Sequence, residues 1–419
     1  MTGKEYVEAD FREVADNTDP HDRYTATLDE HTGDLTENTL RALTLQLAGA
    51  PEQHTDLGAN THGDITLAIT HTTNTNISHL INVLCDLHPG STTHLNGTNT
   101  TATGVLGDTR SGELEPGPLL DPNVAFTAIE QFSSLNTDTI DAFTQILDTQ
   151  TYSFSNSNYR DTVPAPGSIL IATEFKYGGL DQYESLIEQL NLPPTITTSV
   201  DLHIPTFSND SASLHTDIEP FSADFAKAYI EHIRTLDPTL TRETRIHISE
   251  YVTDLKTRVD GLDDLAWEIN QTRLTNTLTR LSLAHARLQN NTSTSRSDAK
   301  RIIALFESIN ETLGRDPEQF DTDNDFSATL VKPDSDSPDG YTHRPDTPIS
   351  EISEELPVLD VYNAIRTLEN SYSDGAPLDG VISECREKNI DEDTVRETIE
   401  ELRFVGEVYE PKQGTLRST

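Results

Sequence analysis

Two apolar runs flank a short polar turn in the first quarter of the chain, and few folds accommodate this arrangement. The runs are ITLAI (65–69) and HLINVLCDL (79–87), and the polar turn THTTNTNIS (70–78) lies between them. An apolar strand, a polar turn and an amphipathic helix together form the layout of a phosphate-binding loop in α/β proteins. The turn contains no glycine and no lysine, although these residues approach and neutralise the phosphates in such loops.

Further apolar runs indicate more buried strands. VAFTAI (124–129), SILIAT (168–173) and VDLHIP (200–205) alternate with helical patterns such as IDAFTQIL (140–147). Strands that alternate with helices predict an α/β fold with a largely parallel sheet. After Phe221 the pattern is wholly helical and predicts an all-α lid of about four helices.

Composition and periodicity divide the chain into five segments. The final segment has the order of three helices, a turn at Gly406 and short strands, which is the arrangement of a winged-helix domain. The predicted segments are a loose N-terminal arm (1–36), an α/β domain (37–215), a helical lid (216–313), an acidic linker (314–356) and a winged-helix domain (357–419).

The chain is strongly acidic. It has 71 Asp and Glu residues against 29 Lys and Arg residues, a formal net charge of −42, and the carboxylates are spread along its length. An acidic interaction tail would instead concentrate them, so the pattern favours a halophilic archaeon with a cytoplasm of high salt. At about 1 M salt the Debye length is roughly 3 Å, so the acidity does not exclude a nucleic-acid partner.

Cysteine usage and hydropathy indicate a cytoplasmic protein. The two cysteines, Cys85 and Cys385, form no CxxC pair, so neither a zinc site nor a disulfide framework is expected. No apolar stretch of about 18 residues occurs, and the N-terminus lacks a signal-peptide pattern. We therefore expect no membrane partner.

Several longer stretches carry a family resemblance. They include LRALTLQLAGA, LEPGPLL, IEQF, YGGLDQYESLIEQLNLPPTI, LSLAHARL and, near the C-terminus, RFVGEVYEPKQGTLRST. From about Glu37 onward the chain resembles the minichromosome maintenance (MCM) family, the AAA+ replicative DNA helicases of archaea and eukaryotes. The resemblance implies an AAA+ P-loop-type parallel sheet with flanking helices, an all-α lid and a C-terminal winged helix. The family's N-terminal half, with its oligonucleotide-binding barrel and zinc module, has no expected counterpart in this sequence.

The resemblance implies ATP and Mg²⁺ as cofactors, but the corresponding motifs are altered. The family's loop reads GDPGTAKS; Thr75 and Ser78 match it, whereas Ile77 takes the place of the lysine. Glu130 and Gln131 take the places of an Asp-Glu pair that holds Mg²⁺ and activates water. Gln131 cannot accept a proton as a base. An alternative is that this pair simply ends a strand.

Three further positions complete the implied nucleotide site. Glu174 stands where the family has a sensor asparagine, and Ser199 stands where it has an arginine finger, a group worth about 10³–10⁵ in rate. Arg273 matches the second sensor arginine and is the expected phosphate contact that remains. Arg280 and Arg287, on the same predicted helix, are interpreted as solvated or ion-paired residues.

The resemblance also implies two DNA contacts. A pore-facing hairpin is expected within 151–163, with Asn156 in place of its lysine and Arg160 as its basic residue. In the winged helix, Arg396 and Arg403 lie on the third helix and Lys412 lies on the wing. That helix is also rich in carboxylates, so DNA contact and protein docking both remain open.

These losses predict an MCM-like protein that does not hydrolyse ATP. It would act by association with MCM helicase subunits, as a homo- or hetero-oligomer, or through its winged helix. The alternatives are an active ATP-dependent DNA helicase with unusual motifs, a winged-helix DNA-binding regulator, and a decaying gene without a cellular role.

Overall fold

The computed structural model describes two parts of the chain. The first covers residues 6–314 except 34, 54–61, 156–158, 181–185, 208–217 and 260–269, and the second covers parts of 361–418. Residues 1–330 and 331–419 form two compact units. Nearly all of the predicted acidic linker, residues 315–356, lies outside the described residues.

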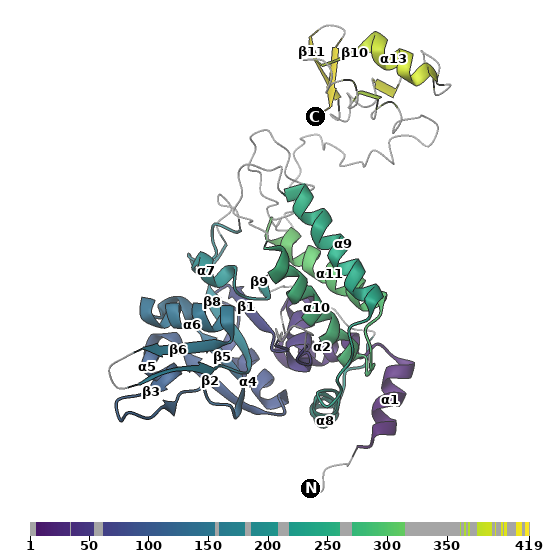
Figure 1. Cartoon of the computed structure of the whole chain (residues 1–419). Helices are drawn as coiled ribbons and strands as arrows, with labels where there is room; N and C mark the ends of the chain where they lie inside the picture. The colour runs from purple at the N-terminus through teal and green to yellow at the C-terminus, as the bar shows by residue number, and fades with distance from the viewer. Residues whose placement is uncertain are drawn as a thin grey trace, which may run out of the picture. The chain divides into compact units, whose positions relative to one another are not determined.

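A five-stranded parallel sheet forms the centre of the first unit (Figure 1). The strand order is β2-β5-β8-β1-β9. The bounds are β1 Thr66–His71, β2 Ser91–Asn96, β5 Val124–Glu130, β8 Ser168–Glu174 and β9 Leu202–Thr206. The four apolar runs predicted as strands are confirmed. Strand β2 was not predicted, because STTHLN has only one apolar residue. The α/β architecture is consistent with an AAA+ P-loop fold.

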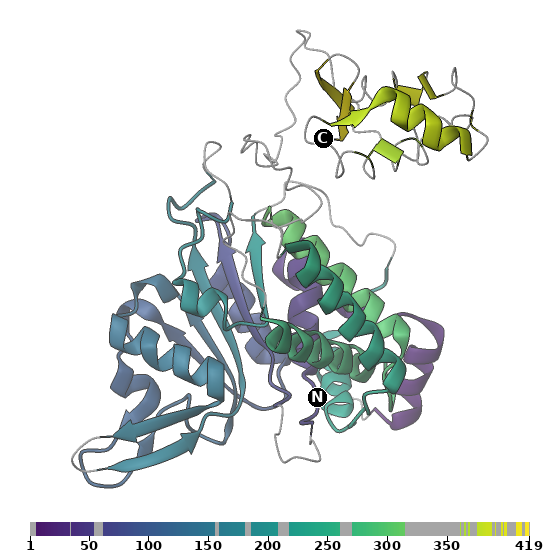
Figure 2. The same cartoon turned by 45° about the horizontal axis from the view of Figure 1, so that its top comes forward.

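Helices cover both faces of this sheet. Successive side chains along a strand point to opposite faces and join two different hydrophobic clusters. Leu67 and Ile69 of β1 join one cluster, together with α3 (Glu37–Ala48) and α4 (Ile77–Leu87). Ala68, between them, joins the other cluster with α6 (Thr137–Thr149). Figure 2 shows α6 and the lid helices on opposite sides of the sheet.

The turn after β1 leads directly into α4. All six residues of β1 are buried, as expected for a strand between two layers of helices. Asn76 caps α4, because its side chain accepts a hydrogen bond from the backbone N–H of His79 at 3.2 Å. The predicted order of strand, polar turn and helix is therefore confirmed.

The N-terminal segment is the main correction to the predicted organisation. Residues 1–36 were expected to form a loose arm, but α1 (Glu8–Asn17) and α2 (Pro20–Thr32) are helices. Tyr24 and Leu28 of α2 are completely buried and join the core of the sheet domain. The expectation was wrong because one apolar stripe among many polar residues is enough to hold a helix against a core.

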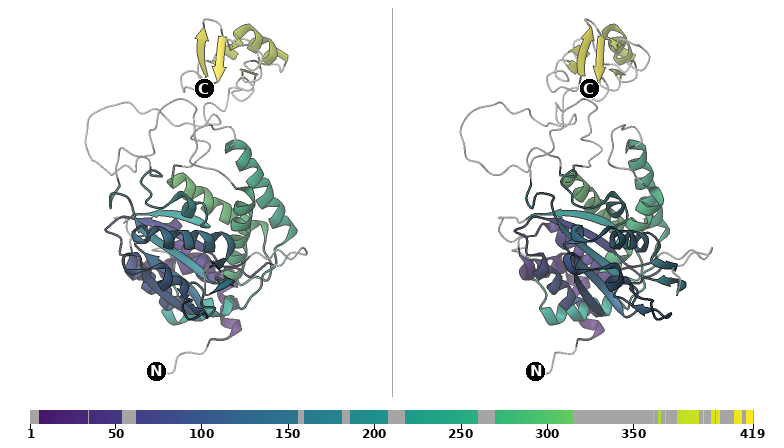
Figure 3. Two further views of the ribbon diagram at one scale, coloured as in Figure 1. Left: turned by 60° about the vertical axis from the view of Figure 1, so that its left-hand side comes forward. Right: turned by 90° about the vertical axis from the view of Figure 1, so that its left-hand side faces the viewer.

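Four helices in the described part of the lid segment confirm its predicted helical character. They are α8 (Ala223–Ile233), α9 (Arg242–Val259), α10 (Gln271–Leu288) and α11 (Arg296–Thr312). They lie along one side of the sheet, as the green ribbons in Figure 3 show. Helix α10 packs against α9, α11 and α3, so it joins the lid to the α/β domain.

Shorter elements connect these layers. They are η1 Gly97–Asn99, α5 Ala102–Leu106, β3 Gly107–Asp108, β4 Glu115–Pro116, η2 Phe132–Ser134, β6 Thr151–Ser155, β7 Arg160–Pro164 and α7 Pro194–Thr197. The pairs β3-β4 and β6-β7 form two small antiparallel sheets. The β6-β7 hairpin lies where the sequence predicts a hairpin.

The second unit has a small core of its own. Helix α13 (Leu378–Glu387) accompanies a three-stranded antiparallel sheet of order β10-β12-β11. The strands are β10 Ala376–Pro377, β11 Val408–Lys412 and β12 Thr415–Ser418. Val381, Cys385 and Leu416 are among the residues buried in this core.

Within the described residues, no helix is both long and apolar enough to cross a bilayer.

Truncation of Leu28 tests whether α2 belongs to the folded domain. Its side chain is completely buried, so we expect Leu28→Ala to lower the free energy of unfolding by about 2–5 kcal/mol. Urea denaturation monitored by circular dichroism measures the change. Val7→Ala is the control, because Val7 is 57% exposed. Equal effects of the two substitutions would contradict the packing of α2.

Acidification should destabilise the fold through His88. Burial and the charge of Arg234 lower the pKa of His88 from 6.5 to about 4. Its ring stacks on Phe126, and its Nδ1 accepts a hydrogen bond from the N–H of Gly90. The unfolded chain therefore binds a proton at a higher pH than the folded chain does.

The free energy of unfolding should fall between pH 6.5 and about 4, by up to about 3 kcal/mol from this group. Denaturation at a series of pH values tests this. In His88→Gln the part of the pH dependence that belongs to His88 should vanish, whereas an unchanged profile would show that His88 does not titrate in this way.

Candidate nucleotide site

Polar side chains gather where three neighbouring strands end. Strand β1 ends at His71, β5 at Glu130 and β8 at Glu174, and the three strands are adjacent and parallel. The turn 72–76 follows β1 and brings Thr75 and Ser78 to the same edge. In open parallel sheets, ligands bind at this carboxyl edge. The fold therefore places Thr75, Ser78, Glu130 and Glu174, which the sequence indicates as candidate residues, at this edge.

The carboxylate of Glu130 is held by three polar neighbours. Ser78 Oγ donates to its Oε2 at 2.5 Å, Asn96 Nδ2 donates to its Oε1 at 2.8 Å, and His94 Nε2 lies 3.6 Å from Oε2. Burial raises the pKa of Glu130, but the hydrogen bonds from Ser78 and Asn96 and the charge of His94 outweigh it, so the pKa is lowered overall. Glu130 is therefore an ionised acceptor that its own neighbours already bind.

His94 and Asn96 were not among the predicted site residues. Both lie on β2, and Asn96 is directly opposite Glu130 in the register of β2 and β5. A histidine and an asparagine two residues apart lie on the same face of a strand. That spacing in STTHLN was the available signal, but a strand with so little apolar character is hard to recognise.

Hydrogen bonds within the protein already engage much of the turn after β1. The N–H of Thr73 donates to Gly178 O at 2.7 Å, and Thr73 Oγ1 donates to the same carbonyl at 2.8 Å. The N–H of Thr75 donates to Thr72 O, and the N–H of Ile77 donates to Thr75 O. A bound phosphate would have to displace these partners, because it needs the N–H groups of such a loop.

Ile77, in the place of the family's lysine, points into the core. Its side chain is 8% exposed and packs in the cluster formed by α3, α4 and the sheet. The first turn of α4 carries a weak positive dipole, but the turn 70–78 contains no lysine or arginine. The edge therefore lacks the side chain that neutralises phosphate charge in this kind of loop.

Glu174 adds a second carboxylate to the edge. It lies opposite His71 in the register of β1 and β8. A Cβ atom built on Gly178 would lie 2.6 Å from Thr73 Oγ1 and 4.0 Å from Glu174 Oε2, so the carboxylate is close to the turn. Two carboxylates, Glu130 and Glu174, thus border a turn that would have to hold an anion.

Gln131 is in a strained conformation directly after β5. Its φ of 54° lies in the left-handed region, which residues other than glycine seldom adopt. Gly97 allows this turn, because a Cβ on Gly97 would lie 2.1 Å from Gln131 O. The strain fixes the direction in which the chain leaves β5, next to Glu130.

Arg273 lies in an ion pair at the start of α10. Its Nη2 lies 2.5 Å from Asp148 Oδ1, and its Nη1 donates to Thr198 O at 2.5 Å and to Ser199 Oγ at 3.3 Å. Ser199 Oγ in turn donates to Asp148 at 2.7 Å. The structure thus brings together the positions of the second sensor and of the arginine finger, and Asp148 neutralises the one arginine there.

Arg280 and Arg287 are buried, and Arg287 pairs with Asp237 at 3.5 Å. Both arginines are ion-paired, so that interpretation is confirmed, whereas the alternative of solvated residues is wrong. Arg280 forms a buried ion pair with Asp201 at 2.7 Å. Arg287 Nη1 donates to the backbone carbonyls of Ala48 and Gly49, at 3.3 and 3.2 Å. Both arginines tie the lid to the α/β domain.

The predicted DNA-contacting residues are only partly described. Arg160 is exposed at the start of β7 and faces Ser155 across the hairpin, whereas Asn156 lies outside the described residues. In the second unit, Arg396 is exposed and Lys412 lies opposite Thr415. Arg403 lies outside the described residues.

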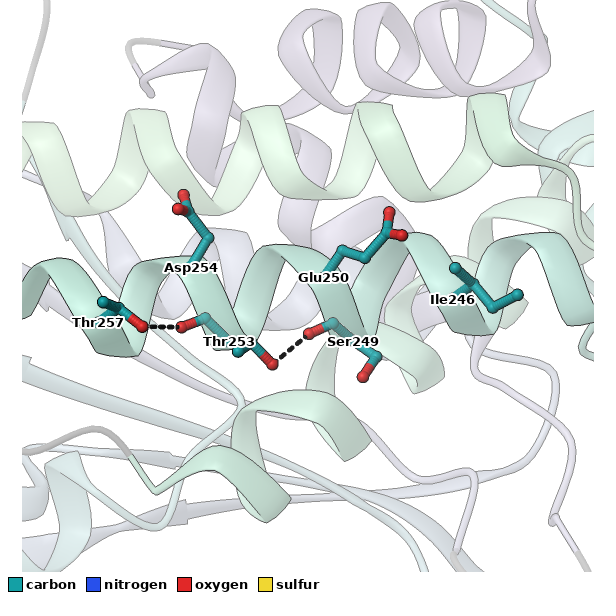
Figure 4. A pocket seen from close by; sticks show the side chains of 6 residues that line it. All are labelled: Ile246, Ser249, Glu250, Thr253, Asp254 and Thr257. Atoms are coloured by element: carbon teal, nitrogen blue, oxygen red, sulfur yellow. Dashed lines mark hydrogen bonds between the residues drawn. The ribbon is translucent and has the colours of Figure 1, made fainter.

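The described surface also contains a shallow groove on α9 with a volume of about 520 Å³ (Figure 4). The lining residues are Ile246, Ser249, Glu250, Thr253, Asp254 and Thr257. Thr253 and Thr257 donate to the backbone carbonyls four residues earlier. None of the predicted site residues lines this groove. Among the described residues, no group of three or more His, Cys, Asp or Glu side chains could hold a metal ion.

Comparison with known families identifies the fold. The MCM P-loop domain matches residues 8–219, and the MCM AAA-lid domain matches residues 224–310. The chain belongs to the MCM family. The match begins at residue 8, so the P-loop domain of this MCM protein includes the two N-terminal helices α1 and α2.

Known MCM proteins are similar to this chain at low identity. An uncharacterized MCM-type protein of Methanocaldococcus jannaschii is 23% identical over an alignment 331 residues long, which covers 72% of this chain and 40% of that protein. The DNA replication licensing factor MCM7 of Arabidopsis thaliana is 22% identical over 68% of this chain and 43% of its own length. The minichromosome maintenance protein MCM of Saccharolobus solfataricus is 21% identical over 84% of this chain and 51% of its own. The chain thus spans about half the length of these relatives or less.

A substitution at Gly178 tests the contact between the turn and the loop after β8. Gly178 has a φ of +71°, and an added methyl group would lie 2.6 Å from Thr73 Oγ1. We expect Gly178→Ala to lower the free energy of unfolding by about 1–3 kcal/mol. Urea denaturation measures the loss.

The same substitution in a Thr73→Ala background separates the two causes. Removing the hydroxyl group relieves the steric part, so the loss should be smaller there, whereas the cost of the positive φ persists. Equal losses in both backgrounds would show that Thr73 does not contact this loop.

Proposed function

We propose that this MCM family protein is a helicase-like subunit that does not hydrolyse ATP. It acts by association with other MCM subunits or through its C-terminal unit, which we propose to be a winged-helix domain. The observation that carries the proposal is the replacement of the phosphate-binding lysine by Ile77, whose side chain is buried in the core.

Four features support this proposal together. Ile77 supplies no charge, the N–H of Thr73 is bound to Gly178, and Glu174 adds negative charge beside the turn. At the other end of the domain, Asp148 neutralises Arg273. Each feature removes a contribution that phosphoryl transfer requires, namely charge neutralisation or positioning of the phosphates.

The residues at this edge are poorly suited to bind ATP together with Mg²⁺. Glu130 and Ser78 have the oxygen chemistry that suits Mg²⁺, but each already binds the other. Mg²⁺ in such sites is held largely through the phosphates of the nucleotide, and the turn after β1 lacks the means to hold them.

The acidity of the chain supports a setting of high salt for this function. A net charge of −42 repels itself at low ionic strength, and salt screens that repulsion. We propose that the protein works in the cytoplasm of a halophilic archaeon. Activity measurements accordingly belong at high salt.

The proposed lack of hydrolysis can be tested by measuring ATP turnover by the purified protein. The assay uses about 1 M KCl, where the Debye length is about 3 Å. We expect ATP turnover at the background level and the same level in Glu130→Gln. Calorimetric titration with ATP, with and without Mg²⁺, should give no saturable heat. Turnover that Glu130→Gln abolishes would overturn the proposal, because it would show that the edge of the sheet still performs the chemistry.

A further inference from the structure

Helix α10 forms side-chain hydrogen bonds to the α/β domain along nearly its whole length. Arg273, Thr277, Arg280 and Arg287 occupy positions i, i+4, i+7 and i+14, which share one face of a helix. Each of these side chains contacts a residue outside the lid. The contacts run from the loop before β9 to the end of α3.

The centre of this face is the carboxylate of Asp201. Thr277 Oγ1 donates to its Oδ1 at 2.8 Å, and Arg280 Nη1 lies 2.7 Å from both of its oxygens. The backbone N–H of Thr66, at the start of β1, donates to Oδ2 at 2.8 Å. The side chains of Asp201 and Arg280 are 5% and 9% exposed. One buried carboxylate therefore binds the lid and the first strand of the sheet together.

The C-terminal part of α10 holds the end of α3. Arg287 donates to the carbonyls of Ala48 and Gly49, and Arg234, which follows α8, donates to Leu47 O at 2.8 Å. These carbonyls belong to the last turn of α3, which has no further helical N–H groups to bind. Burial and the neighbouring Arg234 lower the pKa of Arg287 to about 10, so it remains charged near neutral pH.

The N-terminal part of α10 differs from the rest in its exposure. Arg273 and Asp148 have 32% and 45% of their side chains exposed. Salt screens an exposed pair, whereas it screens a buried pair much less. The buried contacts of Asp201 therefore hold at the high salt that the composition favours, even where the outer pair weakens.

We propose that this face of α10, defined by Arg273, Thr277, Arg280 and Arg287, is a latch that fixes the helical lid on the α/β domain in one orientation. The latch deepens the proposed function, because a lid that cannot move could not transmit a nucleotide cycle to neighbouring subunits. Its geometry does not depend on whether a nucleotide binds.

Pulsed electron–electron double resonance measures the distance between two spin labels in the full chain. This distance reports the orientation of the lid. The labels are placed at exposed positions, Ser249 on α9 and Thr149 on α6, after Cys85 and Cys385 are replaced by serine. A latched lid gives a single narrow distance distribution at low and high KCl. A broad or multiple distribution would overturn the latch.

Asp201→Asn removes the central charge, and we expect a second, longer distance population to appear. Asp254→Asn is the matched control. It also removes the charge of an ion-paired aspartate, but this ion pair, with Arg258 at 3.1 Å, lies wholly within α9. A distribution in Asp201→Asn as narrow as in the control would overturn the latch. Should Asp201→Asn fail to fold, Thr277→Val removes a single hydrogen bond to the same carboxylate and should broaden the distribution less, but more than the control.

Addition of ATP and Mg²⁺ separates the latch from the proposed function. A shift of the distance distribution on addition would overturn the latch. ATP turnover together with an unchanged distribution would overturn the proposed lack of hydrolysis and leave the latch intact.

Discussion

The carboxylate of Asp201 connects the two largest parts of the first unit. A buried carboxylate without partners would be strongly destabilising, so its position requires both the arginine of the lid and the backbone N–H of β1. Asp201 also ties the loop before β9 to β1 through backbone hydrogen bonding between the N–H of Asp201 and Thr66 O. The relation of α10 to the sheet, and through the sheet to the candidate site, follows from this arrangement.

The candidate site keeps the framework of a phosphate site but not its electrostatics. The sheet order, the turn after β1 and the capped start of α4 position the backbone as such a site requires. The side chains then oppose an anion, since Glu130 and Glu174 are the charged groups that the three strands bring to this edge. Packing can preserve a fold without preserving its chemistry, because the chemistry depends on the identity of a few side chains.

Much of the fold follows from apolar periodicity, and the exceptions have a common cause. Four buried strands and the lid helices were predictable because their apolar residues are continuous or recur at helical spacing. Strand β2 and helix α2 were not, since both are largely polar and acquire their structure from neighbours. In α2 the pair Asp19 and Pro20 is a capping signal that could have shown where the helix begins.

The proximity of Ser78 and Glu130 could be predicted from the sequence, but the hydrogen bonds around them could not. Position along the chain placed Ser78 and Glu130 at one edge, because parallel strands end together. The partners His94 and Asn96 depend on a strand that periodicity did not reveal. The pairing of Arg273 with Asp148 joins residues 125 positions apart, and a single sequence holds no signal for such a contact.

The burial of Ile77 limits what a single substitution at this position could achieve. A lysine at this position would direct its side chain among the apolar side chains that now surround the isoleucine, and burial of its ammonium group there would be costly. The carbonyl of Gly178 would still hold the N–H of Thr73. An Ile77→Lys substitution alone would thus cost stability and leave this N–H engaged, so it would not by itself make the turn available to an anion.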